Sequence, residues 1–230
     1  MMGYFLPFIL LTILITFHEA GHFIMAYVLG IKVDKICIYP SGGISKFNMA
    51  MNEVLIKEFL VLIMGPIAQI ITCYLLIHIS YFNRYIDMIT MYNNSILIFN
   101  LLPIYPLDGG RLLNIIMSLK LSFKKSLTYT IYFSFLLIIL LDYLLLPKYL
   151  GINLILINIL LFSKVIDSYK KIPFYSEKFL LERYLNNYKF RKEKVVNNVN
   201  NFMRGKKHLV KIDNKYYTEK EILHKKFDRL

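Results

Sequence analysis

Residues 4–29 read YFLPFILLTILITFHEAGHFIMAYVL, an apolar run that contains two histidines and one glutamate. A helix that crosses a bilayer needs about 20 apolar residues, so this run predicts a transmembrane helix. A cleaved signal peptide over Met1–Thr16 is disfavoured because the segment has no basic n-region and no small-x-small cleavage site follows it. The polar residues of the run therefore lie within the membrane-spanning segment.

The rest of the chain is also unusually apolar, with 57% hydrophobic and 19% charged residues. Four more apolar runs follow the first, at Val54–Ser80, 86–102, Leu127–Leu146 and Ile152–Ile166. The runs at 86–102 and Ile152–Ile166 are short and need tilt or packing to span. The alternative is that these runs are buried helices in the core of a large soluble protein. A chain of 230 residues is too short to surround so many apolar helices with polar ones. We predict a polytopic all-α membrane bundle of about five spans.

Basic residues set the expected topology and mark the tail as a separate part. The net charge is +13, of which residues 167–230, with 17 Lys and Arg against 8 Asp and Glu, carry +9. The positive-inside rule places loop 30–53, stretch 103–126 and the C-terminus in the cytoplasm. The charge has three readings: a solvated cytoplasmic face, attraction to lipid headgroups, or binding of an acidic substrate segment or nucleotide phosphate. Nucleic-acid binding is not expected because no recognised fold accompanies the charge.

The motif His18-Glu19-Ala20-Gly21-His22 is H-E-x-x-H. On a helix, both imidazoles share one face and reach one ion, while Glu19 is offset by about 100°. Neutral imidazoles suit Zn²⁺, which lowers the pKa of its water to about 7 so that a carboxylate takes up the proton. The alternative is a polar helix–helix contact or a water-facing patch. A charged residue at this depth costs at least about 2.5 kcal/mol, which favours a functional site.

Two histidines need a third protein ligand, which leaves a fourth position for water. Asp108 lies in Asn100-Leu-Leu-Pro-Ile-Tyr-Pro-Leu-Asp108-Gly109-Gly110, just past the cytoplasmic end of run 86–102 and at the depth of the histidines. Its prolines and glycines break the helix and let backbone turn inward. The alternative is an interfacial turn with a capping aspartate. The competing ligand candidates are Asp34, Glu53, His78, Asp87 and Asp142.

H-E-A-G-H within a membrane run, followed by N-x-x-P-x-x-P-L-D-G-G, resembles the site-2 protease family of intramembrane zinc metalloproteases. The resemblance implies that His18, His22 and Asp108 hold one zinc ion and that Glu19 activates water. It also implies that Asn100 and Pro106 shape the substrate cleft.

Within this family, the resemblance to a sporulation branch covers nearly the whole chain. The matching segments are Tyr39-Pro-Ser-Gly-Gly43, Met64-Gly-Pro66, Phe179-Leu-Leu-Glu-Arg-Tyr184 and Phe202-Met-Arg-Gly-Lys-Lys-His208. The branch implies cleavage of a membrane-associated pro-sigma factor during endospore formation, in the mother-cell membrane around the forespore. It further implies a single cytoplasmic CBS-like unit that binds ATP, and it allows for inhibitory membrane proteins and an oligomer.

The family pattern has a further transmembrane segment before the zinc helix. Only 17 residues precede His18, so either this branch lacks that helix or the start codon is misassigned. We expect an edge strand in residues 36–48 to hold an unwound substrate segment by β-addition.

We predict three parts: a transmembrane metalloprotease domain over 1–166, a linker over 167–185 and a small α+β unit over 186–230. In the tail, Glu177–Lys194 is expected to form an amphipathic helix, residues 210–217 a hairpin turning at Asp213-Asn214, and Thr218–Glu221 a capping box. His208 and His224 are expected on the surface. The competing function is a non-catalytic metal-binding scaffold or a metal transporter, which would carry polar residues along several helices.

Overall fold

The computed structural model describes residues 5–31, 33–39, 42–47, 50–145, 152–186, 188, 190, 192–212 and 215–228. These residues form two compact units. The first comprises Met1–Met49 and Ile56–Leu102, and the second comprises Ala50–Leu55 and Pro103–Leu230. The predicted turn at Asp213-Asn214, and Pro40 and Ser41 of the segment Tyr39–Gly43, lie outside the described residues.

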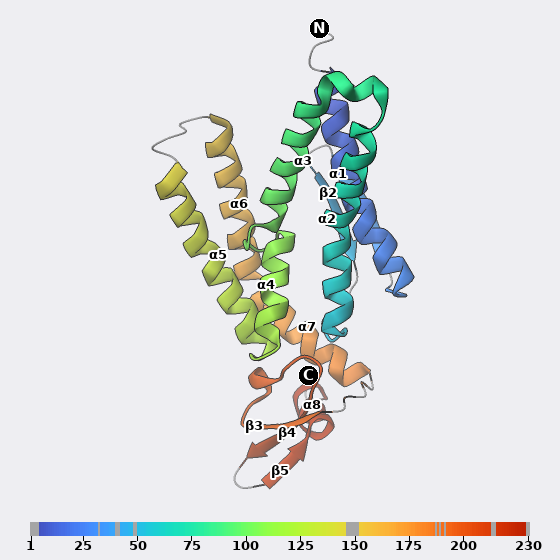
Figure 1. The fold of residues 1–230 in the computed structure, drawn as a ribbon. Coiled ribbons are helices and arrows are strands. Elements are labelled where there is room, and N and C mark those ends of the chain that lie inside the picture. Colours follow the sequence, from blue (N-terminus) through green and yellow to red (C-terminus); the bar gives the residue numbers. More distant parts are fainter. Residues whose placement is uncertain are drawn as a thin grey trace. The chain divides into compact units, whose positions relative to one another are not determined.

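The first unit is built from helices and a β-hairpin (Figure 1). Its helices are α1 (Phe5–Val28), α2 (Leu55–Ile77) and α3 (Ile86–Leu101), with the 3₁₀ turn η2 (Ser80–Tyr85) between the last two. Strands β1 (Val33–Tyr39) and β2 (Gly42–Phe47) pair antiparallel, and β2 contacts α1. The hairpin forms a two-stranded sheet in the predicted region, and each strand has one edge outside the pair.

Apolar side chains from all three helices form the core of the first unit. Leu10 and Leu14 of α1 pack with Cys73 and Leu76 of α2 and with Ile89 of α3. The three helices also carry exposed apolar side chains, such as Phe8, Ile70 and Ile98, on the side away from this core. A helix in contact with lipid needs such an apolar outer face. This composition explains why the helices have no continuous polar face.

Among the residues that the structure describes, three helices are long and apolar enough to cross a membrane: Leu6–Val28, Leu55–Ile77 and Phe123–Leu144. They correspond to the first, second and fourth predicted runs. The third and fifth runs form helices at the predicted places, but spanning by these two remains a prediction.

The second unit joins a helical part to a small sheet (Figure 1). Its long helices are α5 (Phe123–Leu145) and α6 (Ile152–Lys170), which contact each other. Shorter elements complete the unit, namely α4 (Asp108–Ser118), α7 (Ile172–Leu185), β3 (Glu193–Val196), η3 (Val199–Asn201), β4 (Lys207–Ile212), β5 (Lys215–Thr218) and α8 (Glu219–Phe227). In the sheet, β4 lies between a parallel β3 and an antiparallel β5.

Most tail predictions agree with the structure, but one helix boundary and the placement of His208 do not. β4 and β5 form the predicted hairpin, and Thr218 and Glu221 form the capping box at the start of α8. The predicted helix over Glu177–Lys194 is wrong at its end, because α7 stops at Leu185 and residues 193–196 form a strand. Val195 and Val196 have β-branched side chains, which suit a strand, and both pair with β4. Pairing with this neighbouring strand outweighs the local preference for a helix.

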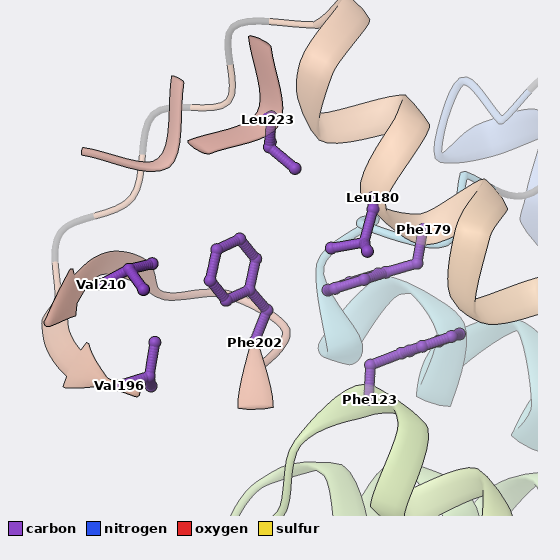
Figure 2. Close-up of a cluster of buried hydrophobic side chains, with 7 residues drawn as sticks. All are labelled: Phe123, Phe179, Leu180, Val196, Phe202, Val210 and Leu223. Carbon is purple, nitrogen blue, oxygen red and sulfur yellow. The ribbon is translucent and has the colours of Figure 1, made fainter. Parts of the chain in front are cut away.

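One apolar cluster links the start of α5, the middle of α7 and the tail sheet (Figure 2). Phe123 and Phe179 stack with ring centroids 4.4 Å apart and planes 2° from parallel. Phe202 and Leu223 complete the cluster from the η3–β4 connection and from α8. Helix α7 therefore belongs to the core of the second unit.

Arg183 of α7 is a buried cation at the centre of this unit, with its side chain 1% exposed. It donates to the Glu219 carboxylate at 2.7 Å, to the Met203 carbonyl at 2.6 Å and to the Asn52 side-chain oxygen at 2.6 Å. Because a buried charge is costly unless it is paired and hydrogen-bonded, these contacts specify how α7, α8 and the segment Ala50–Leu55 pack.

His208 is fully buried, so the prediction that it lies on the surface is wrong, whereas His224 is exposed as predicted. The His208 Nε2 accepts from the Met203 N–H at 3.0 Å, and Nδ1 lies 2.5 Å from the Glu219 carboxylate. The ring stacks on Phe202 with centroids 4.6 Å apart. These contacts require a neutral imidazole with its proton on Nδ1, because protonation of Nε2 would oppose the Met203 N–H.

We expect the stability of the second unit to fall below about pH 6.5. Burial lowers the pKa of His208 below its usual 6.5, although Glu219 opposes this effect. As the pH falls through 6.5, His208 becomes protonated in the unfolded chain but stays neutral in the folded chain, so unfolding becomes more favourable. The stability that neutral His208 contributes is fully present above pH 6.5. It declines as the pH drops towards the folded-state pKa of His208.

The NMR titration of the histidine Cε1 protons in detergent-solubilised protein measures this shift, with His208 assigned by its loss in His208→Asn. The same protein in urea is the control, in which His208 should titrate near 6.5. A folded-state pKa at or above 6.5 would contradict the buried neutral form.

Candidate metal centre

The two histidines of the H-E-x-x-H motif point the same ring nitrogen at a common position. They lie one turn apart on α1, and they are only 2% and 5% exposed. Their Nε2 atoms are 3.2 Å apart, and their rings meet edge to face with centroids 4.8 Å apart. The helix period predicted this shared face, and the structure confirms it.

The opposite nitrogen of each ring is held by an acceptor from α2. His22 Nδ1 lies 2.8 Å from the carbonyl oxygen of Val61, and His18 Nδ1 lies 2.9 Å from Gln69 Oε1. A carbonyl oxygen only accepts, so each Nδ1 carries the proton. The Nε2 atom of each ring is then the lone-pair nitrogen, which is the form that ligates a metal.

This arrangement fits a divalent cation. Two nitrogens that each lie about 2.0–2.1 Å from a tetrahedral zinc are about 3.3 Å apart, close to the 3.2 Å between the Nε2 atoms. Two lone pairs that face each other at this distance repel, and a shared cation turns this repulsion into attraction. The donor pair of His18 and His22 therefore has both the spacing and the protonation state of a zinc ligand pair.

Two glycines let α1 and α2 approach closely enough for these contacts. A Cβ on Gly65 of α2 would lie 2.3 Å from Cε1 and Nε2 of His22, and a Cβ on Gly21 would lie 2.3 Å from the Met64 carbonyl oxygen. Any side chain at either position would push the helices apart or displace His22. The adjacent Pro66 removes the N–H that would bond the Leu62 carbonyl, which loosens the helix beside Val61.

Glu19 and Asn100 also belong to the first unit. Glu19 is partly buried on α1, at the position offset from the two histidines. Asn100, near the end of α3, places its side-chain nitrogen 3.5 Å from His18 Nε2. Asn100 comes from a motif 82 residues away in the sequence, so the fold brings part of the second motif to the histidines.

Asp108 and Pro106 belong to the second unit. Asp108 is the first residue of α4, where a carboxylate is favoured by the helix dipole. The preceding loop is fixed by the Tyr105 N–H, which donates to the Ser134 hydroxyl of α5 at 2.8 Å. A Cβ on Gly110 would lie 2.3 Å from the Tyr105 nitrogen, so the loop folds back onto α4 only with glycine there.

The family model described as Peptidase family M50 matches residues 6–86 and 78–141. The chain belongs to this family. Family M50 comprises the site-2 proteases, and the chain is an integral-membrane zinc metalloprotease of this type. The two matched ranges contain both motifs, so the family model covers His18, Glu19, His22, Asn100, Pro106 and Asp108.

Individual relatives of this M50 chain agree with the assignment. Stage IV sporulation protein FB of Bacillus subtilis is 29% identical over 98% of this chain and 85% of its own length. Zinc metalloprotease MJ0392 of Methanocaldococcus jannaschii is 35% identical over 52% of this chain and 36% of its own length. The solved structure of the site-2 protease from Methanocaldococcus jannaschii superposes with a TM-score of 0.58 at 28% identity, covering 73% of this chain and 79% of that one.

Two groups that orient the histidines of this M50 chain, Gln69 and the Val61 carbonyl, are not among the residues predicted from the sequence. Gln69 is an uncharged polar residue in the middle of an apolar helix, and this was a usable signal because such residues need a partner in a membrane. The Val61 carbonyl carries no sequence signal at all, because every residue has one.

Proposed function

We propose that this M50 protease cleaves a membrane-associated pro-sigma factor on the cytoplasmic side of the membrane during endospore formation. The facing Nε2 pair of His18 and His22 is the observation that supports the metal chemistry. The similarity to stage IV sporulation protein FB over almost the full chain supports the substrate class and a mother-cell location.

His18, His22 and Asp108 would hold the zinc ion in this proposal. When bound, zinc polarises the scissile carbonyl and makes a water molecule nucleophilic near neutral pH. Two neutral imidazoles and one carboxylate form a ligand set that zinc proteases use. The β-turn-like loop held by Ser134 and Gly110 would present the Asp108 carboxylate from the N-terminus of α4.

Glu19 would act as the general base and then the general acid. From its position on α1, offset from the two proposed ligands, its carboxylate would take a proton from the attacking water and return it to the leaving nitrogen. Partial burial limits the access of bulk water to this carboxylate. Asn100 and Pro106 would line the substrate cleft beside this group.

The substrate helix must unwind before cleavage, because a helix hides its carbonyl carbons from attack. The hairpin of β1 and β2 would receive the unwound segment as an added strand. Main-chain hydrogen bonds would then align the scissile bond without requiring a particular side-chain sequence.

The proposal includes five spans, in which α3 and α6 cross the membrane in addition to α1, α2 and α5. It also places the C-terminus in the cytoplasm and treats residues 186–230, after a linker over 167–185, as a CBS-like unit that binds ATP. The basic charge of the tail and its small mixed sheet support this reading. Inhibitory membrane proteins and an oligomer would regulate access to the site.

Co-expression with candidate pro-sigma factors tests the function directly. The native chain should convert the precursor to a shorter product, seen as a size shift on a gel, and a metal chelator should suppress the conversion in membranes. A precursor that stays intact with the native chain would refute the substrate class. Stoichiometric zinc in the same preparation would show that the metal assignment still holds.

A further inference from the structure

Gln69 is a fully buried amide in the middle of α2, within a helix made almost entirely of apolar residues. Burying an amide without partners costs several kcal/mol in an apolar medium, so its retention requires partners. The structure gives it contacts on both sides, to His18 of α1 and to Asn93 of α3. Gln69 therefore joins the three helices of the first unit through polar contacts.

The orientation of the Gln69 amide follows from Asn93. Gln69 Nε2 donates to the Asn93 carbonyl oxygen at 3.0 Å and to the Asn93 side-chain oxygen at 3.1 Å. Asn93 Nδ2 in turn donates to the Asn94 side-chain oxygen at 3.4 Å, which favours this orientation of Asn93. With its nitrogen engaged by two oxygens, Gln69 has only Oε1 left to face His18.

The direction of this hydrogen-bond chain determines the state of the histidine. Oε1 of Gln69 accepts from His18 Nδ1, so the proton of the neutral ring is on Nδ1 and the lone pair is on Nε2. The same contact fixes the rotation of the ring, because Oε1 lies close to the ring plane only at one orientation. In His22 the Val61 backbone carbonyl accepts from Nδ1 and so keeps the proton on that nitrogen. No side-chain substitution removes this acceptor.

We propose that Gln69 is a positioning residue for the metal site: the relay from Asn93 through Gln69 to His18 holds the His18 ring in the Nδ1–H tautomer with Nε2 directed at the zinc. The inference rests on the proposed function, in which His18 is a zinc ligand. Gln69 acts through His18 and touches neither the substrate nor the reacting atoms.

Zinc affinity of purified, detergent-solubilised protein, measured by competition with a chromophoric chelator, tests the relay. Gln69→Leu removes the acceptor at similar size, and it should weaken zinc binding by about 10- to 100-fold, as expected for a lost partner of a metal-bound histidine. Gln69→Glu keeps an acceptor oxygen for His18 Nδ1 and, when protonated, a donor for the Asn93 oxygens, so it should bind zinc within a few-fold of the native protein. Asn93→Ala should fall between the two.

Thr72→Val is the matched control, because it removes a buried hydroxyl of the same helix that, within the described part of the chain, bonds the Ala68 carbonyl of its own helix and neither histidine. Its zinc affinity should equal that of the native chain. Native affinity in Gln69→Leu, or equal losses in Gln69→Leu, Gln69→Glu and Thr72→Val, would overturn the proposal, since equal losses indicate general damage to α2.

The ¹⁵N chemical shifts of the His18 ring in the metal-free protein provide a second measurement, independent of zinc binding. The native chain should show one tautomer, protonated on Nδ1, and Gln69→Leu should show a mixture. A mixture already present in the native chain would refute the relay. Failure of the native chain to bind zinc would refute the metal assignment instead, and the tautomer measurement would still decide the role of Gln69.

Discussion

Glu19→Gln should abolish proteolysis while leaving the zinc content unchanged. Glutamine has almost the same size and still forms hydrogen bonds, although an NH2 donor replaces one acceptor oxygen, and its amide does not accept a proton from water. Loss of a general base lowers the rate by about 10²- to 10⁴-fold, which would leave no product on a co-expression gel. Zinc should stay at the native ratio to protein because Glu19 is offset on α1 from His18 and His22, the two histidines proposed as ligands.

Glu193→Gln provides the matched control for this variant. It makes the same chemical change in β3, where Glu193 forms an exposed ion pair with Lys207 at 3.1 Å. An exposed pair contributes at most about 1 kcal/mol to stability, so cleavage should match the native chain. Undiminished cleavage by Glu19→Gln would show that another group accepts the proton, and loss of zinc in that variant would make Glu19 a ligand.

Asp108→Ala should reduce zinc binding by more than about 100-fold. Loss of a partner to a ligand already costs about 10- to 100-fold in affinity, and loss of a ligand itself should cost more. The substitution also removes a carboxylate from the N-terminus of α4, but that interaction contributes only about 0.3–1 kcal/mol, too little to unfold the second unit. Metal analysis of the purified variant, together with its melting temperature, separates the two effects.

Asp167→Ala is the control for this experiment, because Asp167 forms an exposed ion pair with Lys171 at 2.8 Å and lies outside both motifs. It should retain one zinc per chain. Equal zinc content in Asp108→Ala and the native protein would show that a residue other than Asp108 is the third ligand. Absence of zinc from the native protein would remove the basis of the proposed mechanism.

Local patterns predicted most of the secondary structure correctly. The five apolar runs became the helices α1, α2, α3, α5 and α6, each within a few residues of the predicted bounds. The Thr218–Glu221 capping box and the β4–β5 hairpin also formed as predicted. These features depend on residues close in sequence, such as an N-cap and its third residue, so the sequence is sufficient to predict them.

Predictions that depended on tertiary partners fared less well. Glu193 and Lys194, the last residues of the predicted helix, lie in strand β3 instead, because β4 provides a pairing edge. His208 is buried because Glu219 and the Met203 N–H satisfy both of its nitrogens, a pairing that its polar neighbours in the sequence did not suggest. Both errors concern partners that come from another element of the tail.

By itself the sequence determined the character of the metal site: a helical H-E-x-x-H places two imidazoles one turn apart, and the helix period alone makes their faces coincide. The tertiary structure decided which nitrogen of each ring carries the proton and which keeps the lone pair that a metal ion would need. The Val61 carbonyl and the Gln69 amide, 39 and 51 residues further along the chain, bind the two Nδ1 atoms. A ring tautomer depends on the acceptor nearest in space, and only the packing of α2 against α1 supplies that acceptor.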